Sequence, residues 1–394
     1  MANINDYLKW RGDIKLNERK LNILDSMVLS RFSYLPFWEI DLKENDTVEE
    51  VCKKIKVLED YNFIYNGDRD LSINLIKSPR FNNMIVSDYL NHYDKKIEKQ
   101  FSAVVIHLND DYMYVSFCGT DKTLIGWKED FNLSYMENVP AQLDALKYMT
   151  NIANKYPNKK IITGGHSKGG NLAIYASIMN TKEVQDRIVK IHNFDGPGFS
   201  KNILSQIKNK DIIDKITTYI PEESVIGRLL EHKEKCVIVK SDLKGIYQHD
   251  IFSWRVLGTD VVKAPKVDKF SETINITVNK WLLSTTPNQR KIFVDNVFEI
   301  MQSTNSETYS EFYSKFIKKL PTMLKAYRGI DENDRKVIIK MIKEFAKAYF
   351  SVFMESRKEK RKVRKRVKKE KKNAVWDNHN YTYWNTFTFY LWTI

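Results

Sequence analysis

Between residues 101 and 239, short apolar runs of strand composition alternate with stretches whose apolar positions follow helical spacing. The strand-like runs are residues 101–108, 112–117, 161–163, 189–194, 216–220 and 236–239, and helical stretches cover 140–156 and 168–180. The first two runs, joined by Asn109, Asp110 and Asp111, are typical of a β-hairpin. Strands that alternate with helices predict an α/β fold with a mainly parallel sheet covered by helices on both faces.

The segments on either side of this core have a helical pattern. Residues 1–98 show helical spacing near 22–30, 47–58 and 70–76, so we expect a helical or irregular part before a sheet core over 99–268. After residue 268 the predicted helices are 271–283, 287–302, 306–325 and 331 to about 371. Residues 269–355 are therefore expected to form a C-terminal helical extension, either a lid over a site or a separate small domain.

The net charge of +14 is concentrated near the end of the chain. Residues 357–372 hold twelve Lys or Arg and two Glu, and the last twenty residues are rich in Trp, Tyr, Phe and Thr. We interpret 356–394 as a flexible basic and aromatic tail, since a charge block is usually solvated. The alternative is attachment to an anionic membrane surface, with nucleic acid the less favoured partner.

The cysteines and the lengths of the apolar segments indicate the cellular compartment of the protein. Cys52, Cys118 and Cys236 are far apart and match no disulfide or metal spacing, which suits a reducing compartment. No basic start leads into an apolar run, and no stretch of about 18 apolar residues exists. The expectation is a cytoplasmic protein, with peripheral attachment to the membrane as the alternative, in which Cys118 is a small buried side chain.

The strongest chemical motif is Gly165-His166-Ser167-Lys168-Gly169, which lies between a short strand and a helix. A serine exposed at the top of a sheet needs a strained turn, where a side chain at either flanking glycine would collide with backbone. This context favours a nucleophile elbow centred on Ser167 over an ordinary turn. The amide of Lys168 would then face a developing oxyanion, and Thr120, at another strand end, would supply a second amide.

A serine nucleophile needs a base, and His249 is the best candidate. In hydrolases built on this elbow, the acid and then the histidine follow the serine in the chain. His249 follows the last strand, in a loop. The excluded histidines precede the serine, lie inside a strand before the candidate acid, or fall in charged or tail segments: His92, His107, His166, His192, His232 and His379.

The acid is less sharply defined. Asp195 ends the strand that follows the elbow helix, in a glycine- and proline-containing turn that would hold it rigidly. Glu222 and Glu223 end the next strand and are the alternative acids. We favour Asp195.

With these residues in view, the chain resembles the Mbeg-like family of bacterial α/β-hydrolase-fold proteins, which is related to the class 3 lipases. The resemblance covers residue 5 to about 265 and implies an α/β-hydrolase fold. The matching segments are Tyr7–Asp13, Phe117–Thr120, Gly165–Ala173, Asn193–Phe199 and Gln248–Trp254. The relation to class 3 lipases implies that Gly119 and Thr120 form the oxyanion loop.

The resemblance leaves the acid open. Class 3 lipases place it after the strand that matches 216–220, where this chain has Glu222 and Glu223. Vertebrate-type lipases place it in a Gly-Leu-Asp-Pro segment, to which residues 194–197 are similar. The resemblance therefore supports Asp195 without excluding the glutamates.

The sequence predicts a serine hydrolase that cleaves a carboxylic ester, such as a lipid or another acyl ester, with Ser167, His249 and Asp195 as its triad. This chemistry requires no cofactor or metal. One alternative is a non-catalytic binding or scaffold protein with the same fold. Another is a protein that associates with a membrane surface or nucleic acid through the basic tail.

Overall fold

The computed structural model describes residues 1–58, 61–314, 316–355, 357–358 and 361. The strands are β1 (Ile85–Asp94), β2 (Lys99–His107), β3 (Tyr112–Phe117), β4 (Lys160–His166), β5 (Ile188–Phe194), β6 (Ile216–Pro221), β7 (Lys235–Val239), β8 (Val256–Leu257) and β9 (Asp260–Val261). The α-helices are α1 (Ile4–Arg11), α2 (Ile23–Phe32), α3 (Val48–Lys56), α4 (Gly67–Ile76), α5 (Leu124–Asn132), α6 (Pro140–Lys155), α7 (Lys168–Ile178), α8 (Lys182–Arg187), α9 (Lys201–Ser205), α10 (Asp211–Asp214), α11 (Lys269–Leu283), α12 (Pro287–Gln302), α13 (Tyr309–Tyr313) and α14 (Phe316–Gly329). A further helix covers 332–355, and short 3-10 turns include η2 (Ile226–Arg228), η3 (Gly245–His249) and η4 (Ile251–Ser253).

One seven-stranded sheet organises the protein, with its strands in chain order from β1 to β7. β1, β2 and β3 pair in antiparallel fashion, and the pairs from β3 to β7 are parallel. The parallel strands are joined by crossovers that contain helices, as the alternating pattern predicts. Their carboxyl ends consequently share one edge, and Ser167, Asp195 and the segment after β6 all begin there.

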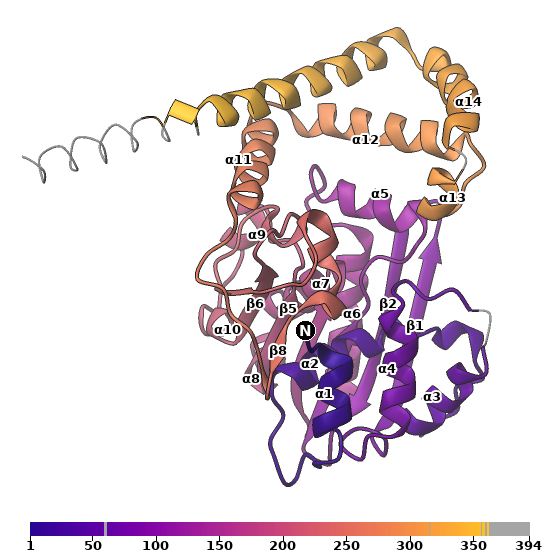
Figure 1. Ribbon diagram of the computed structural model, residues 1–394, viewed down its shortest axis with the longest axis vertical. Helices are drawn as coiled ribbons and strands as arrows, with labels where there is room; N and C mark the ends of the chain where they lie inside the picture. Colours follow the sequence, from indigo (N-terminus) through magenta and orange to yellow (C-terminus); the bar gives the residue numbers. More distant parts are fainter. Residues whose placement is uncertain (59–60, 315, 356, 359–360, 362–394) are drawn as a thin grey trace, which may run out of the picture.

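Helices cover both faces of the sheet (Figure 1). Along β2 the pleat sends Val104 and Ile106 into one buried cluster and Ala103 and Val105 into another. The first cluster contains side chains of α1 to α4, and the second contains side chains of α6 and α7. The mainly parallel sheet with helices on both faces, an α/β-hydrolase fold with a C-terminal helical extension, confirms the predicted fold class.

The sheet begins earlier than the sequence indicates. β1 lies within residues 1–98, which we expected to be helical or irregular, and the predicted boundary at residue 99 therefore divides a hairpin. The reason is that β1 is an edge strand with mostly half-buried or exposed positions, a bulge between Ser87 and Leu90, and many polar residues. It lacks the apolar run that identifies the inner strands.

The helical extension contacts the core near the sheet's carboxyl edge through α11, through α12 and through the segment before α13, where the Leu124 amide donates to the Glu307 carbonyl at 2.9 Å. α11 approaches the loop after β6, where Ser271 Oγ donates a 2.5 Å hydrogen bond to the carbonyl of Ser224. α12 lies against α5, where Phe131 and Phe298 meet ring to ring at 5.6 Å and Lys128 pairs with Asp295 at 2.9 Å. The predicted helix over 306–325 is in fact divided into α13 and α14. Within the described residues, no helix combines the length and apolarity that crossing a bilayer requires.

Candidate active site

Ser167 occupies the strained turn that the motif predicts. Its φ of 58° and ψ of −133° lie in a region that residues with a side chain rarely adopt. The flanking glycines make the turn possible, since a Cβ on Gly165 would stand 2.3 Å from the carbonyl carbon of Gly169, and one on Gly169 would stand 2.2 Å from the carbonyl oxygen of Phe117. The serine is only half-buried, whereas the whole of α7 behind it is buried.

Strand register brings the predicted site segments to one place. His166 of β4 pairs with Phe194 of β5, and the amide of Ser167 donates to the Phe194 carbonyl at 2.8 Å. Asp195 is therefore the immediate neighbour of the elbow across the sheet edge. On the other side Gly165 pairs with Phe117 of β3, so that the loop with Thr120 leaves the same edge.

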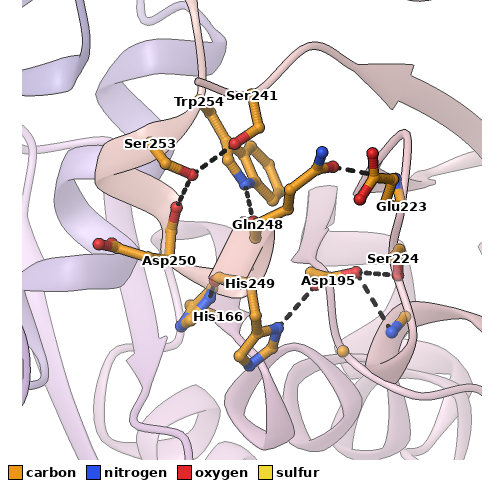
Figure 2. A network of polar contacts seen from close by, with 12 residues as sticks. His166, Asp195, Glu223, Ser224, Ser241, Gln248, His249, Asp250, Ser253 and Trp254 are labelled. Atoms are coloured by element: carbon orange, nitrogen blue, oxygen red, sulfur yellow. Dashed lines mark hydrogen bonds and ion pairs between the residues drawn. The ribbon is translucent and has the colours of Figure 1, made fainter. Parts of the chain in front are cut away.

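Asp195 and His249 form a direct pair (Figure 2). The Oδ2 atom of Asp195 lies 2.7 Å from Nδ1 of His249. The other oxygen, Oδ1, accepts hydrogen bonds from the Ser224 hydroxyl at 2.5 Å and the Gly227 amide at 3.2 Å. The Asp195 carboxylate is fully buried, whereas the His249 side chain is 17% exposed. One side of the imidazole is thus held by a fixed acceptor, and the ring is still partly accessible.

The two glutamates lie elsewhere. The Glu223 carboxylate accepts a hydrogen bond from the Gly245 amide, and the Glu223 amide donates to Gln248 at 2.9 Å. Glu222 contributes backbone bonds to Val239 and Asp268. In this arrangement Asp195 holds the His249 ring, and Glu223 fastens the 3-10 turn that carries it.

The His249 turn is further fixed from its far side, as Figure 2 shows. The indole of Trp254, fully buried, donates to the Gln248 carbonyl at 2.8 Å. Ser253 donates to the Asp250 carbonyl at 2.6 Å and bonds Ser241 at 2.7 Å. These bonds fix the backbone on both sides of His249, which limits the positions its ring can take.

The elbow histidine, which the sequence analysis excludes as a base, holds this turn as well. Nε2 of His166 lies 2.7 Å from the His249 carbonyl oxygen, which can only accept, so Nε2 carries the proton. Burial lowers the pKa of His166 well below its usual value, and the charges of His249 and Arg31 lower it further. The ring is therefore neutral, and it lies 4.6 Å from the His249 ring between centroids.

Beneath His166 lies a buried ion pair that sequence reasoning missed. Arg31 binds Asp68 through two bonds of 2.5 and 2.6 Å, and both side chains are fully buried. The guanidinium stacks over Tyr34 at 3.7 Å, and the Tyr34 hydroxyl donates to the His166 carbonyl at 2.9 Å. The N-terminal helices thus support the elbow directly.

The sequence predicts that the amides of Lys168 and Thr120 bind an oxyanion. Among the described residues, the amides of Lys168 and Thr120 donate no hydrogen bond to the protein. The approach of the two loops requires Gly119, because a Cβ there would lie 2.5 Å from the His166 carbonyl oxygen. The Thr120 hydroxyl donates to Asp130 at 2.5 Å, and burial raises the pKa of Asp130 to about 6.

The side chain of Lys168 points away from the site. Its ammonium group lies 2.9 Å from Glu129, 2.9 Å from the Gln100 carbonyl oxygen and 2.7 Å from the Gln100 side-chain oxygen. Burial lowers the pKa of Lys168, but the carboxylates of Glu129 and Asp130 outweigh that effect and the net shift is upward. Only the backbone of this residue faces the site.

Two further residues considered in the sequence, Cys118 and His192, lie in the protein interior. Cys118 is buried, and burial raises its thiol pKa to about 12, which is the behaviour of an inert side chain. His192 is buried in β5, with its pKa lowered to about 3 by burial. Across the described part of the chain, no hydrogen bond joins the Ser167 hydroxyl to His249, whose Nδ1 is bound to Asp195.

Several solved structures, lipases among them, are similar to this chain at low identity. A fungal lipase–inhibitor complex is 13% identical, over 49% of this chain and 76% of that one, with a TM-score of 0.33. Lip2 lipase from Yarrowia lipolytica is 12% identical, over 60% and 83%, with a TM-score of 0.31. A mutant form of MDLA from Penicillium cyclopium is 10% identical, over 63% and 88%, with a TM-score of 0.37.

No curated protein matches the sequence. The model of one protein family, Mbeg1-like, matches residues 75–299, which include Ser167, Asp195 and His249. That match covers more than half of the 394 residues, and the chain therefore belongs to the Mbeg1-like family.

Proposed function

We propose that this protein is a serine hydrolase that cleaves a carboxylic ester, such as a lipid or another acyl ester. The observation that carries the proposal is the 2.7 Å pair between Asp195 and His249 beside a serine held at positive φ. A serine hydroxyl is a weak nucleophile until a positioned imidazole accepts its proton. The chain provides the serine after β4, the carboxylate after β5 and the imidazole in the 3-10 turn that follows β7.

In the proposed mechanism, Ser167 Oγ attacks the ester carbonyl while Nε2 of His249 takes the hydroxyl proton. Asp195, bound to Nδ1, keeps the ring in the required tautomer and stabilises the imidazolium that forms. The amides of Lys168 and Thr120 bind the oxyanion. His249 then protonates the leaving alcohol, and water hydrolyses the acyl-enzyme by the same steps in reverse order.

Attack requires the Ser167 side chain and the His249 ring to come into hydrogen-bond contact. Rotation about one serine side-chain torsion changes the position of Oγ, and His249 is the more exposed member of its pair with Asp195. The buried, three-fold bonded Asp195 stays in place during this adjustment.

The first test is the replacement Ser167→Ala. We expect hydrolysis of a p-nitrophenyl ester to fall by about 10⁴-fold or more, because the nucleophile is lost, while the thermal unfolding temperature stays unchanged. Ser205→Ala, which removes an exposed hydroxyl on α9, is the matched control and should keep full activity.

Labelling by a fluorophosphonate provides the second readout. The wild type and Ser205→Ala should be labelled, whereas Ser167→Ala and His249→Ala should not. Retained turnover in folded Ser167→Ala would reject the mechanism. Absence of both labelling and turnover in the wild type, across esters of short and long chains, would favour a non-catalytic binding protein instead.

A further inference from the structure

The helix over 332–355 has two apolar faces. Ile338, Met341, Ala348 and Val352 are buried, and their spacing places them on one side. That side packs on the extension, where the Trp281 indole donates to the Met341 carbonyl at 3.1 Å. These contacts account for one face only.

The second face is exposed and has large side chains. Ile339, Ile342, Phe350 and Phe353 are 43%, 57%, 64% and 42% exposed, and Ala346 lies between them. Steps of three and four residues put all five on one stripe, centred about 125° around the helix from the buried side. Contiguous exposed apolar surface of this kind marks an interaction site. We name these five residues the apolar stripe.

Cations run along one edge of the apolar stripe. Lys336, Lys340, Lys343 and Lys347 follow one another at steps of four, three and four residues. Lys343 and Lys347 line a shallow hollow with Ala346, Phe350 and Met354. Lys336 and Lys347 pair with Glu332 and Glu344 of the same helix, so the row of four lysines keeps an excess of positive charge.

The position of this helix leaves the stripe accessible. It runs along the outer border of the molecule, beyond α12 and far from the sheet (Figure 1). Arg357 and Lys358 are exposed at its end, and the sequence over 357–372 adds ten more Lys or Arg. The cationic row thus leads directly into the strongest positive charge in the chain.

We propose that this helix docks on an anionic lipid surface, with the apolar stripe in the interface and the lysines against the headgroups. A helix with one apolar face and flanking cations lies in the plane of such a surface, and each nearby Lys or Arg adds to the attraction. A second copy of the chain fits the stripe less well, because antiparallel packing of two stripes would bring two lysine rows together and parallel packing would leave both rows without an anionic partner. Nucleic acid would use the cations and leave the apolar side chains without a role.

The test is co-sedimentation of the full-length protein with vesicles of phosphatidylcholine, with or without about one third phosphatidylserine. We expect binding to the anionic vesicles that weakens as salt increases. The double replacement Ile342→Ser with Phe350→Ser should reduce the partition coefficient at least about tenfold, because two apolar side chains no longer enter the interface. Lys340→Glu with Lys343→Glu should reduce it similarly.

Two matched replacements far from the helix are the controls. Leu257→Ser changes an exposed apolar residue of β8, and Lys201→Glu changes an exposed lysine of α9. Both should bind vesicles as the wild type does, and all variants should unfold at the same temperature. Ser167→Ala should also bind normally, which separates this proposal from the proposed hydrolase activity.

Three results would overturn the proposal. One is equal binding to neutral and anionic vesicles. Another is loss of binding on removal of residues 359–394 with no effect of the serine or glutamate replacements, which would assign the affinity to the tail alone. The third is a change in oligomeric state, measured by light scattering, in the serine variants without any change in lipid binding.

Discussion

Asp195 combines an unusual backbone with a complete set of bonds. Its φ of 55° is in the left-handed region, which aspartate tolerates better than most residues. That conformation turns the carboxylate toward both His249 and the loop with Ser224 and Gly227. A carboxylate placed in this way can hold an imidazole in one tautomer. What matters is that both of its oxygens accept hydrogen bonds, more than the size of the side chain.

The replacement Asp195→Asn tests this point. Because an amide nitrogen can donate to Nδ1, the histidine would adopt the wrong tautomer, and we expect kcat for a p-nitrophenyl ester to fall by about 10⁴-fold. Glu222→Gln is the control, since its side chain lies outside the His249 contacts, and it should leave kcat unchanged. The reverse ranking of the two variants would assign the acid to the other strand.

At the residue scale, much of the candidate site follows from the sequence. Ser167, Asp195 and His249 could be selected because each follows an identifiable strand, and parallel strands end at one edge. Ser224 and Gly227 could not, since their partner becomes apparent only when the loop after β6 folds over Asp195. The bond from His166 to the His249 carbonyl likewise depends on a tertiary contact between residues 83 positions apart.

At the scale of elements, a buried ion pair joins four of them at the back of the elbow. Lys168 begins α7 and binds Glu129 of α5, whose carboxylate also accepts from the amides of Gln100 in β2 and Ala141 in α6. Both charged side chains are at most 1% exposed. The backbone of Lys168, whose amide we propose as an oxyanion donor, is therefore anchored by its own side chain.

Glu129→Gln should destabilise the protein, because the buried Lys168 ammonium loses the carboxylate that binds it directly. We expect a loss of about 3–5 kcal/mol in the free energy of unfolding, measured by urea denaturation. Adding Lys168→Met should recover part of the loss. Removal of the exposed Lys182 of the pair with Asp186 is the control and should have no measurable effect. A Glu129→Gln variant as stable as the wild type would show that the pair is not needed.

The elements that sequence analysis missed share a physical cause. β1 and the break between α13 and α14 both lie where few side chains are buried, and α14 has no buried residue at all. Periodicity reveals an element only when one face is removed from water. The inner strands and α7 meet that condition, and their predicted positions are confirmed.

The molecule as a whole buries neutral histidines, and this gives its stability a pH dependence. Burial lowers the pKa of His107, His166 and His192, so each takes up a proton more readily after unfolding. Stability from these groups is complete above the unfolded pKa near 6.5 and is lost as the pH falls below it. Asp130 acts in the opposite direction. Because its pKa is raised to about 6, its buried carboxylate takes up a proton on acidification, and the free-energy cost of burying the charge is removed.

His192→Leu isolates one of these groups. The pKa of His192 is about 3 in the folded protein. Because of this group, the free energy of unfolding of the wild type should fall by about 2 kcal/mol between pH 7 and pH 5. The variant should not show this part of the decrease. Denaturation curves of both proteins at the two pH values provide the measurement. Because Asp130 is common to both, its effect cancels in the difference. An equal decrease in unfolding free energy in both proteins would mean that the pKa of His192 is not lowered in the folded protein.

The hydrogen bond from His166 to the backbone of His249 also prevents His166 from taking over the proposed role of His249. One nitrogen of the elbow ring is committed as a donor, and the other faces the permanent positive charge of Arg31 at 3.5 Å. A chain that lost His249 would keep an imidazole next to its serine and still have no substitute able to accept the proton. Evolution or design could therefore silence the proposed chemistry by one exchange at position 249 and leave a folded, inert receptor behind.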